Sequence, residues 1–139
     1  MLSVQRHVLE SNASVSKIRA LIKAELIKAG VRPSGAFDCL VAVTEACAKA
    51  LRHKQDSPVD KPPRIGWKIS AEAASFYVDD FSGHDWEMDI PTIDLDNPLA
   101  ELGIDDFGVA ALRKLMDEVS FEKTEDETQT VVVLSKRFR

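Results

Sequence analysis

Hydrophobic positions change their period several times along the chain, and each change predicts an element. A weak alternation over residues 3–9 predicts a short opening strand. Apolar residues then recur every three or four positions over residues 14–29, which predicts a helix ended by Gly30. A second helix is predicted from about residue 33 to residue 53, with an apolar stripe formed by Phe37, Leu40, Val41, Thr44, Ala48 and Leu51.

The second half of the chain alternates with period two, which is typical of strands. Residues 64–70 and 75–80 alternate on either side of a short turn and predict a hairpin. Residues 84–103 contain two prolines and little periodicity, which is typical of a long loop over a binding site. A third helix is predicted to begin at Asp105 or Asp106. Two final strands complete the order, over residues 119–123 and 128–137.

This order of elements predicts an α+β fold. Helices would gather on one face of a mixed, mostly antiparallel sheet and give a two-layer α/β sandwich. With 139 residues the chain is long enough to bury a core and short enough for a single domain over residues 1–139. The pattern alone gives no function, because one fold carries many activities.

Charge and composition exclude several classes of protein. A net charge of −5 argues against a direct nucleic-acid binder, whose affinity would depend on neutralising phosphates. No apolar run approaches the roughly 18 residues of a membrane span, and the first residues lack the apolar stretch of a signal peptide. We therefore expect a cytoplasmic protein that contacts no membrane.

The cysteines and histidines predict no metal centre. Cys39 and Cys47 lie eight residues apart in one predicted helix, too far apart along its axis for a disulfide. His7, His53 and His84 are scattered and lack the spacing of metal ligands. Both thiols are interpreted as small buried apolar residues, and His53 as a helix-terminal residue that complements the helix dipole.

The most informative feature is a Glu–Lys pair in the second predicted helix. Glu45 and Lys49 lie four residues apart, so both side chains share one helix face and would meet a common ligand or each other. From the pair alone, an exposed ion pair contributing about a few tenths of a kcal/mol is the simpler interpretation. The residues around the pair make the other interpretation, a common ligand, stronger than it is from the pair alone.

Three segments carry a resemblance to a known family. Residues 45–53 read Glu-Ala-Cys-Ala-Lys-Ala-Leu-Arg-His, residues 108–119 form an apolar helix ending in Leu-Met-Asp-Glu-Val, and residues 130–137 form a closing apolar strand. In order and spacing they resemble the anti-sigma-factor serine kinases, whose first motif is Glu-Ala-Cys-x-Asn-Ala-x-x-His. These belong to the histidine-kinase-like, Hsp90-like and gyrase-like ATPases. The resemblance covers essentially the whole chain and implies the fold of that superfamily.

The resemblance implies a site for ATP and Mg²⁺. Glu45 is the catalytic candidate, since the family's Glu polarises the attacking hydroxyl or water. Lys49 stands where the family has the Asn that coordinates Mg²⁺. Its ammonium has no lone pair for a metal, although it could meet a phosphate as a point charge. Lys49 is therefore a nucleotide-binding candidate, and no residue is assigned to a metal.

The second family motif adds candidates at the end of a predicted strand. Asp80 matches the acid that accepts a hydrogen bond from the adenine amino group. This alignment leaves Ser82 and His84 where the family has glycines that let the backbone approach the ligand. A register shifted by one residue instead makes Asp79 the acid and puts Gly83 at a glycine position. Asp80 and Gly83 are both nucleotide-binding candidates.

The third motif and the loop before it complete the comparison. Gly108 is retained as a nucleotide-binding candidate, whereas Asp106 replaces the first glycine of the motif. Between residues 85 and 106 the chain has eight carboxylates and no Lys or Arg. Such a loop would repel ATP unless a metal or a partner intervened, and it is either solvated or a docking surface for a basic partner. Trp86, beside it, would either anchor a partner or pack back over the pocket.

Three functions follow as hypotheses. The first is a bacterial regulatory protein that binds a sigma factor or an anti-anti-sigma (STAS-type) partner, with ATP binding weakened or lost. The second is an active ATP-dependent serine kinase of an anti-anti-sigma factor. The third is a non-catalytic binding domain whose pocket has been closed or repurposed. The resemblance also suggests a homodimer.

Overall fold

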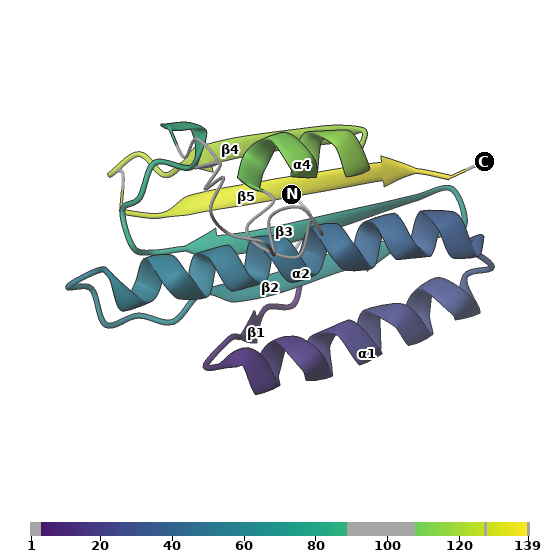
Figure 1. Cartoon of the computed structure of the whole chain (residues 1–139), viewed down its shortest axis with the longest axis horizontal. Coiled ribbons are helices and arrows are strands. Elements are labelled where there is room, and N and C mark those ends of the chain that lie inside the picture. Colours follow the sequence, from purple (N-terminus) through teal and green to yellow (C-terminus); the bar gives the residue numbers. More distant parts are fainter. Residues whose placement is uncertain (1–3, 89–107, 127, 139) are drawn as a thin grey trace, which may run out of the picture.

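An antiparallel sheet forms one layer of the molecule and helices form the other (Figure 1). The computed structural model describes residues 4–88, 108–126 and 128–138. Its strand order is β1-β2-β3-β5-β4, and each neighbouring pair is antiparallel. The strands are β1 (His7–Val8), β2 (Arg64–Ile69), β3 (Ala73–Asp80), β4 (Glu118–Lys123) and β5 (Thr130–Arg137).

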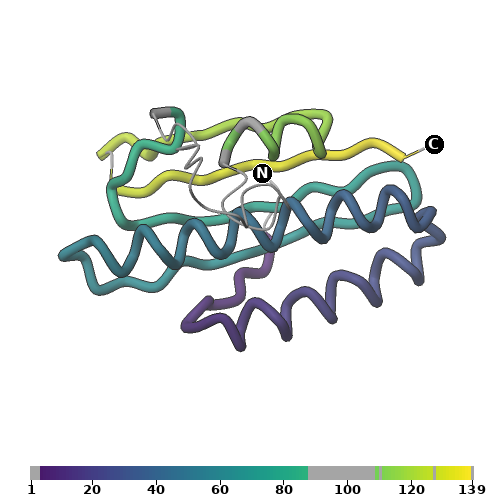
Figure 2. Tube along the Cα trace, in the orientation of Figure 1, coloured from purple at the N-terminus to yellow at the C-terminus, as the bar shows by residue number. Residues whose placement is uncertain are grey.

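The helical layer lies over one face of this sheet. It contains α1 (Asn12–Lys28), α2 (Pro33–Gln55) and α4 (Gly108–Leu115), and a 3₁₀ turn, η1 (Trp86–Met88), follows β3. Helix α2 occupies the middle, where it packs against β3 and β5 and contacts both α1 and α4. Figure 2 traces the chain and shows α1 and α2 side by side. None of the described helices is long and apolar enough to cross a membrane.

Local signals set the ends of the two long helices. Gly30 follows α1 with a φ of +81°, and the N–H of Val31 donates to the carbonyl of Leu26 at 3.1 Å. This type of helix end favours glycine, as the sequence predicts. Pro33 occupies the first turn of α2, where its missing N–H leaves no hydrogen bond unmade. The last turn of α2 carries basic residues that complement the helix dipole, namely Arg52, His53 and Lys54.

The predicted α+β fold with helices on one sheet face is confirmed. The hairpin of β2 and β3 pairs Trp67 with Phe76. The opening strand is shorter than predicted, because among the described residues only His7 and Val8 pair with β2 before α1 begins after Ser11. The predicted start of the third helix and most of the predicted loop over residues 84–103 lie outside the described residues.

The apolar stripe predicted for α2 is only partly buried: Leu51 belongs to the core, but the residues at the start of the stripe do not. Phe37 is 63% exposed, and Leu40 and Val41 are only half-buried. The face that packs on the sheet carries mostly small residues instead, namely Cys39, Ala42, Val43, Ala46, Cys47 and Ala50. Small side chains let a helix approach a sheet closely at the density of a protein interior, so this face points inward while Phe37 remains outside.

Candidate functional site

Three polar residues follow one another along a single face of α2. Glu45, Lys49 and His53 are separated by four residues each, about one helical turn. The last two are buried, with exposed fractions of 2% for Lys49 and 8% for His53. Glu45 is the first of the three along the helix, and its Oε1 is 3.5 Å from Nη2 of Arg52. Glu45 and His53 thus stand roughly 12 Å apart along the helix axis.

His53 meets the carboxylate of Asp80, which ends β3 and points toward the helical layer. Nδ1 of His53 lies 2.8 Å from Oδ2 of Asp80. The indole N–H of Trp86 donates to the same oxygen at 2.7 Å, and the backbone N–H of Ser82 donates to Oδ1 at 2.7 Å. Asp80 is 2% exposed, so hydrogen-bond donors of the protein stabilise its charge in place of water.

The charge state of Asp80 follows from this environment. Burial alone would raise the pKa of the carboxyl group, because it disfavours the charged form. Hydrogen bonds from His53, Ser82 and Trp86 together outweigh that effect and lower the pKa below its usual value. Asp80 is therefore an ionised acceptor at neutral pH, and His53 presents a protonated Nδ1 to it.

Aromatic rings close over this carboxylate. Trp86 is 1% exposed and lies near-parallel to Phe121 of β4, with the ring centroids 6.0 Å apart. His53 meets Trp86 edge-on at 5.1 Å, and His84 stacks on His53 at 4.3 Å. We refer to Asp80, His53, His84, Trp86 and Phe121 as the Asp80 cluster. Such packed rings exclude water from the carboxylate.

The residues of the Asp80 cluster do not fit an adenine base. In the family that the sequence resembles, the acid at this position accepts a hydrogen bond from the adenine amino group. Here the indole N–H of Trp86 donates a hydrogen bond to Asp80 instead, and His53 bonds to the same carboxylate oxygen. Lys49, at the position of the family's metal ligand, offers no lone pair to Mg²⁺. Among the residues that the structure describes, no group of three or more His, Cys, Asp or Glu side chains is placed to hold a metal ion.

The two adjacent acids at the end of β3 point to opposite faces of the sheet. Asp79 turns away from α2, and its Oδ2 accepts hydrogen bonds from Nε of Arg6 at 2.9 Å and Nε of Arg64 at 3.1 Å. Its Oδ1 is buried without a hydrogen-bond partner among the described residues. Of these two acids, Asp80 therefore faces the helical layer and Asp79 faces the other side of the sheet.

The candidate glycines have separate structural settings. Gly83 has a φ of +84°, and a Cβ added there would meet nothing within 4 Å. Its backbone conformation, rather than a close approach of another group, is what favours glycine in this turn. Gly108 is the first residue of α4. The structure brings His53 and Trp86 to Asp80, while Glu45 lies at the other end of the line on α2.

Sequence reasoning missed the contact of His53 with Asp80 and left the place of Trp86 open. His53 is interpreted above as a helix-terminal residue, yet it bonds to Asp80 across 27 positions in sequence. The four-residue spacing of Glu45, Lys49 and His53 was a signal for it, because it places all three on one face. Trp86 carried no such signal. Of its two alternatives, packing back into the molecule is the one that the structure adopts.

The fold and the site together define a class of protein, in which a helical layer covers an antiparallel sheet and a buried acid ends the strand beside the central helix. The profile of the histidine kinase-like ATPase domain matches residues 9–136, and the chain belongs to that family. A search of curated proteins found no significant match.

One solved structure shows the same fold across the whole chain. The crystal structure of the RsbU and RsbW domains of Rv1364c from Mycobacterium tuberculosis matches with a TM-score of 0.66 and 16% sequence identity. The match covers 99% of this chain and 32% of that chain, so this protein spans about a third of the length of the one it resembles. At this identity the likeness concerns the fold alone.

Proposed function

We propose that this protein is a bacterial regulator of the anti-sigma-factor kinase type that works by binding a partner, with ATP binding weakened or lost. The partner would be a sigma factor or an anti-anti-sigma (STAS-type) protein, encountered in the cytoplasm, and the regulator itself would be a homodimer. Family membership and the resemblance of three sequence segments support the type of protein. The binding of Trp86 and His53 to Asp80 supports the loss of nucleotide binding.

An active serine kinase is the second candidate, because Glu45 is retained at the position that the resemblance assigns to the catalytic carboxylate. A kinase requires nucleotide, so titration calorimetry with ATP and ADP, with and without Mg²⁺, separates the two. We expect no heat of binding at about millimolar nucleotide, which corresponds to a binding free energy weaker than about −4 kcal/mol. Mg²⁺-dependent binding by the wild-type protein would favour the kinase.

Two substitutions identify which feature prevents nucleotide binding. Lys49→Asn restores a carbonyl that can ligate Mg²⁺, but we expect no binding from it alone because Trp86 still occupies Asp80. Lys49→Asn combined with Trp86→Ala should bind measurably more ATP. Trp67→Ala is the matched control, since Trp67 donates to Glu25 instead, and combined with Lys49→Asn it should have no effect. Robust ATP binding by Lys49→Asn alone would contradict this account.

A further inference from the structure

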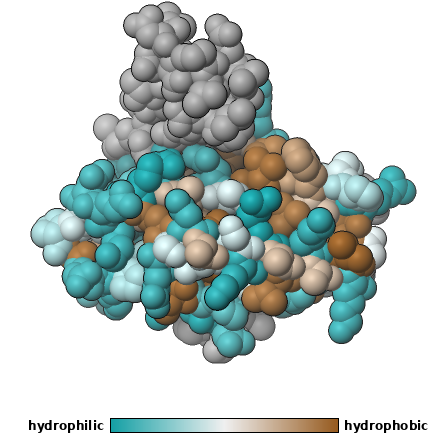
Figure 3. Space-filling view, turned by 60° about the horizontal axis from the view of Figure 1, so that its bottom comes forward, coloured by the Kyte–Doolittle hydropathy of each residue, from teal (hydrophilic) through white to brown (hydrophobic). Residues whose placement is uncertain are grey.

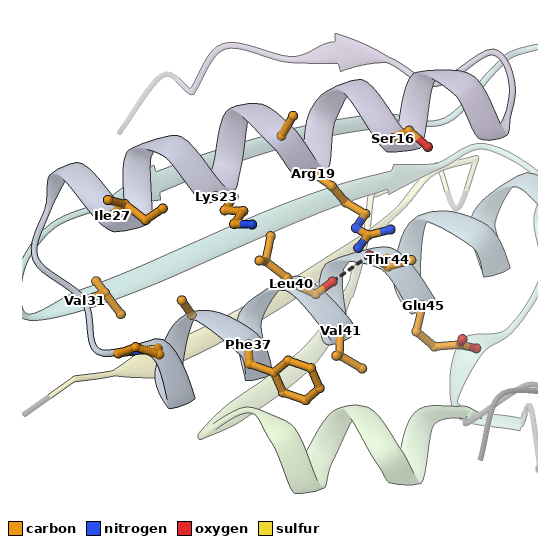
Figure 4. A pocket seen from close by; sticks show the side chains of 13 residues that line it. Ser16, Arg19, Lys23, Ile27, Val31, Phe37, Leu40, Val41, Thr44 and Glu45 are labelled. Atoms are coloured by element: carbon orange, nitrogen blue, oxygen red, sulfur yellow. Dashed lines mark hydrogen bonds between the residues drawn. The ribbon is translucent and has the colours of Figure 1, made fainter. Parts of the chain in front are cut away.

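The outer surface of the helical layer carries an apolar groove between α1 and α2. It has a volume of about 760 Å³ and is lined by residues of both helices and of the turn that joins them. Figure 4 shows Ile27 and Val31 near one end, Leu40 pointing from α2 toward α1, and Glu45 near the other end, with Val41 on the side of α2 away from α1. From Ser16 to Ile27 the α1 wall is roughly 16 Å long, about three helical turns.

Large apolar side chains are exposed to solvent along this groove. Phe37 and Ile27, which line it, are 63% and 64% exposed. Apolar patches interrupt the hydrophilic surface in the space-filling view (Figure 3). Phe37, Leu40 and Val41 belong to the stripe that the sequence predicts to be buried, and the fold itself does not cover them. An exposed apolar surface of this kind marks a site of interaction.

The charges on the groove specify the chemistry of its partner. Arg19 and Lys23 lie on its α1 wall, and neither forms an ion pair with another described residue, whereas Glu45, the acid that lines one end of the groove, is 3.5 Å from Nη2 of Arg52. Helix α1 as a whole carries four cations and one acid, in a chain whose net charge is −5. The acid, Glu25, is engaged by the indole N–H of Trp67. The groove is therefore apolar and, along one wall, positive, which complements an acidic partner.

We propose that this groove binds one amphipathic helix of a partner protein, with carboxylates flanking the apolar face of that helix. A groove whose α1 wall is about three turns long matches the helix-in-groove mode, in which apolar residues at positions i, i+3/i+4 and i+7 enter the groove. The acidic flank would face Arg19 and Lys23. This inference rests on the proposed function as a partner-binding regulator and names the surface and the chemistry of the contact.

Two fluorescent peptides of about 12 residues test the proposal. Both carry the same leucine stripe, flanked in one by glutamates and in the other by lysines, and binding is followed by fluorescence anisotropy. The glutamate peptide should bind at least about tenfold more tightly, and added salt should reduce this difference. Phe37→Glu should weaken the glutamate peptide about tenfold or more. The double variant Arg19→Glu with Lys23→Glu should reverse the preference between the two peptides.

Lys68→Glu is the matched control, because Lys68 is an exposed cation on β2, outside the groove. It should leave both affinities unchanged. Equal binding of the two peptides, or an unchanged affinity in Phe37→Glu, would overturn the proposal. A concentration-dependent dimer seen by sedimentation and lost in Phe37→Glu would assign the groove to a second copy of this chain and would overturn it as well.

The test separates this inference from the proposed function. If a purified sigma factor or anti-anti-sigma protein binds the wild-type protein and Phe37→Glu equally well, the groove assignment is wrong and the regulatory function stands. If neither kind of protein binds while the peptide preference holds, the regulatory function is wrong, and the groove serves an acidic helix from another class of protein.

Discussion

A single carboxylate, that of Asp80, connects three parts of the molecule. It ends β3, receives the side chain of His53 from α2 and accepts the N–H groups of Ser82 and Trp86 from the turn that follows. Each hydrogen bond to a buried charge contributes about 1.5–3 kcal/mol. At the scale of the residue, therefore, Asp80 acts as a structural anchor for the turn after β3.

Acid should release this anchor. The pKa of Asp80 is lowered in the folded protein, so its contribution to the free energy of unfolding is fully present above the ordinary value of 3.8. That contribution is lost as the pH falls below 3.8 and through the folded pKa. Near neutral pH, Asp80→Asn should lower the free energy of unfolding by about 2 kcal/mol, and this difference should shrink below pH 3.8.

Urea unfolding at a series of pH values measures this effect. Asp126→Asn is the control, because Asp126 also has a lowered pKa, caused by hydrogen bonds from Thr124 and Thr128, but is fully exposed. It should leave the stability of the protein near neutral pH almost unchanged. A difference between wild type and Asp80→Asn that stays constant down to acid unfolding would refute the role of Asp80.

At the scale of the element, α2 has two apolar faces with different tasks. One face, built mainly from alanine and cysteine, packs on the sheet, and the other carries larger residues toward α1 and the solvent. Both faces have apolar residues at helical spacing, so spacing alone does not say which is buried. The short side chains of the inner face bring α2 close to β3, and that closeness places His53 within reach of Asp80.

The same substitution, valine to alanine, at one position on each face of α2 compares what the two faces contribute to stability. Val43→Ala should lower the free energy of unfolding by about 2 kcal/mol, because Val43 is fully buried and the change leaves a cavity. Val41→Ala, at a half-buried position that lines the groove, should change it by less than about 0.5 kcal/mol. Urea unfolding compares them directly. Equal losses would mean that the groove face contributes to the core.

At the scale of the whole molecule, the core contains both cysteines. Cys39 and Cys47 are fully buried between α2 and the sheet layer, and burial raises the pKa of each thiol to about 12. A buried thiol with such a pKa does not react as a nucleophile in the folded state. The two thiols thus report on opening of the entire core.

Thiol labelling should follow global unfolding. With a disulfide reagent at neutral pH, both cysteines should react slowly in the native protein and at once in urea. Val43→Ala should accelerate native-state labelling about thirtyfold, in line with its expected loss of about 2 kcal/mol, whereas Val41→Ala should not. Fast labelling of one thiol that does not respond to Val43→Ala would instead reveal a local opening beside that cysteine.

The sequence by itself determined the order of the elements, the α+β fold and the family. Periodicity is a local property, so the hairpin of β2 and β3 and the glycine end of α1 could be predicted from neighbouring residues. The motif around Glu45 gave the family because its spacing is also local. These predictions needed no knowledge of which segments meet in space.

Only the tertiary structure decided which side chains meet. The pairing of His53 with Asp80 joins residues 27 positions apart, and the indole of Trp86 reaches the same carboxylate from a turn without regular pattern. Which side of α2 is exposed also depends on tertiary contacts. The helix packs closely on the sheet, and the face with mostly small side chains allows that close packing. Contacts between distant segments depend on packing of the whole chain, and the state of the candidate site is set by such contacts.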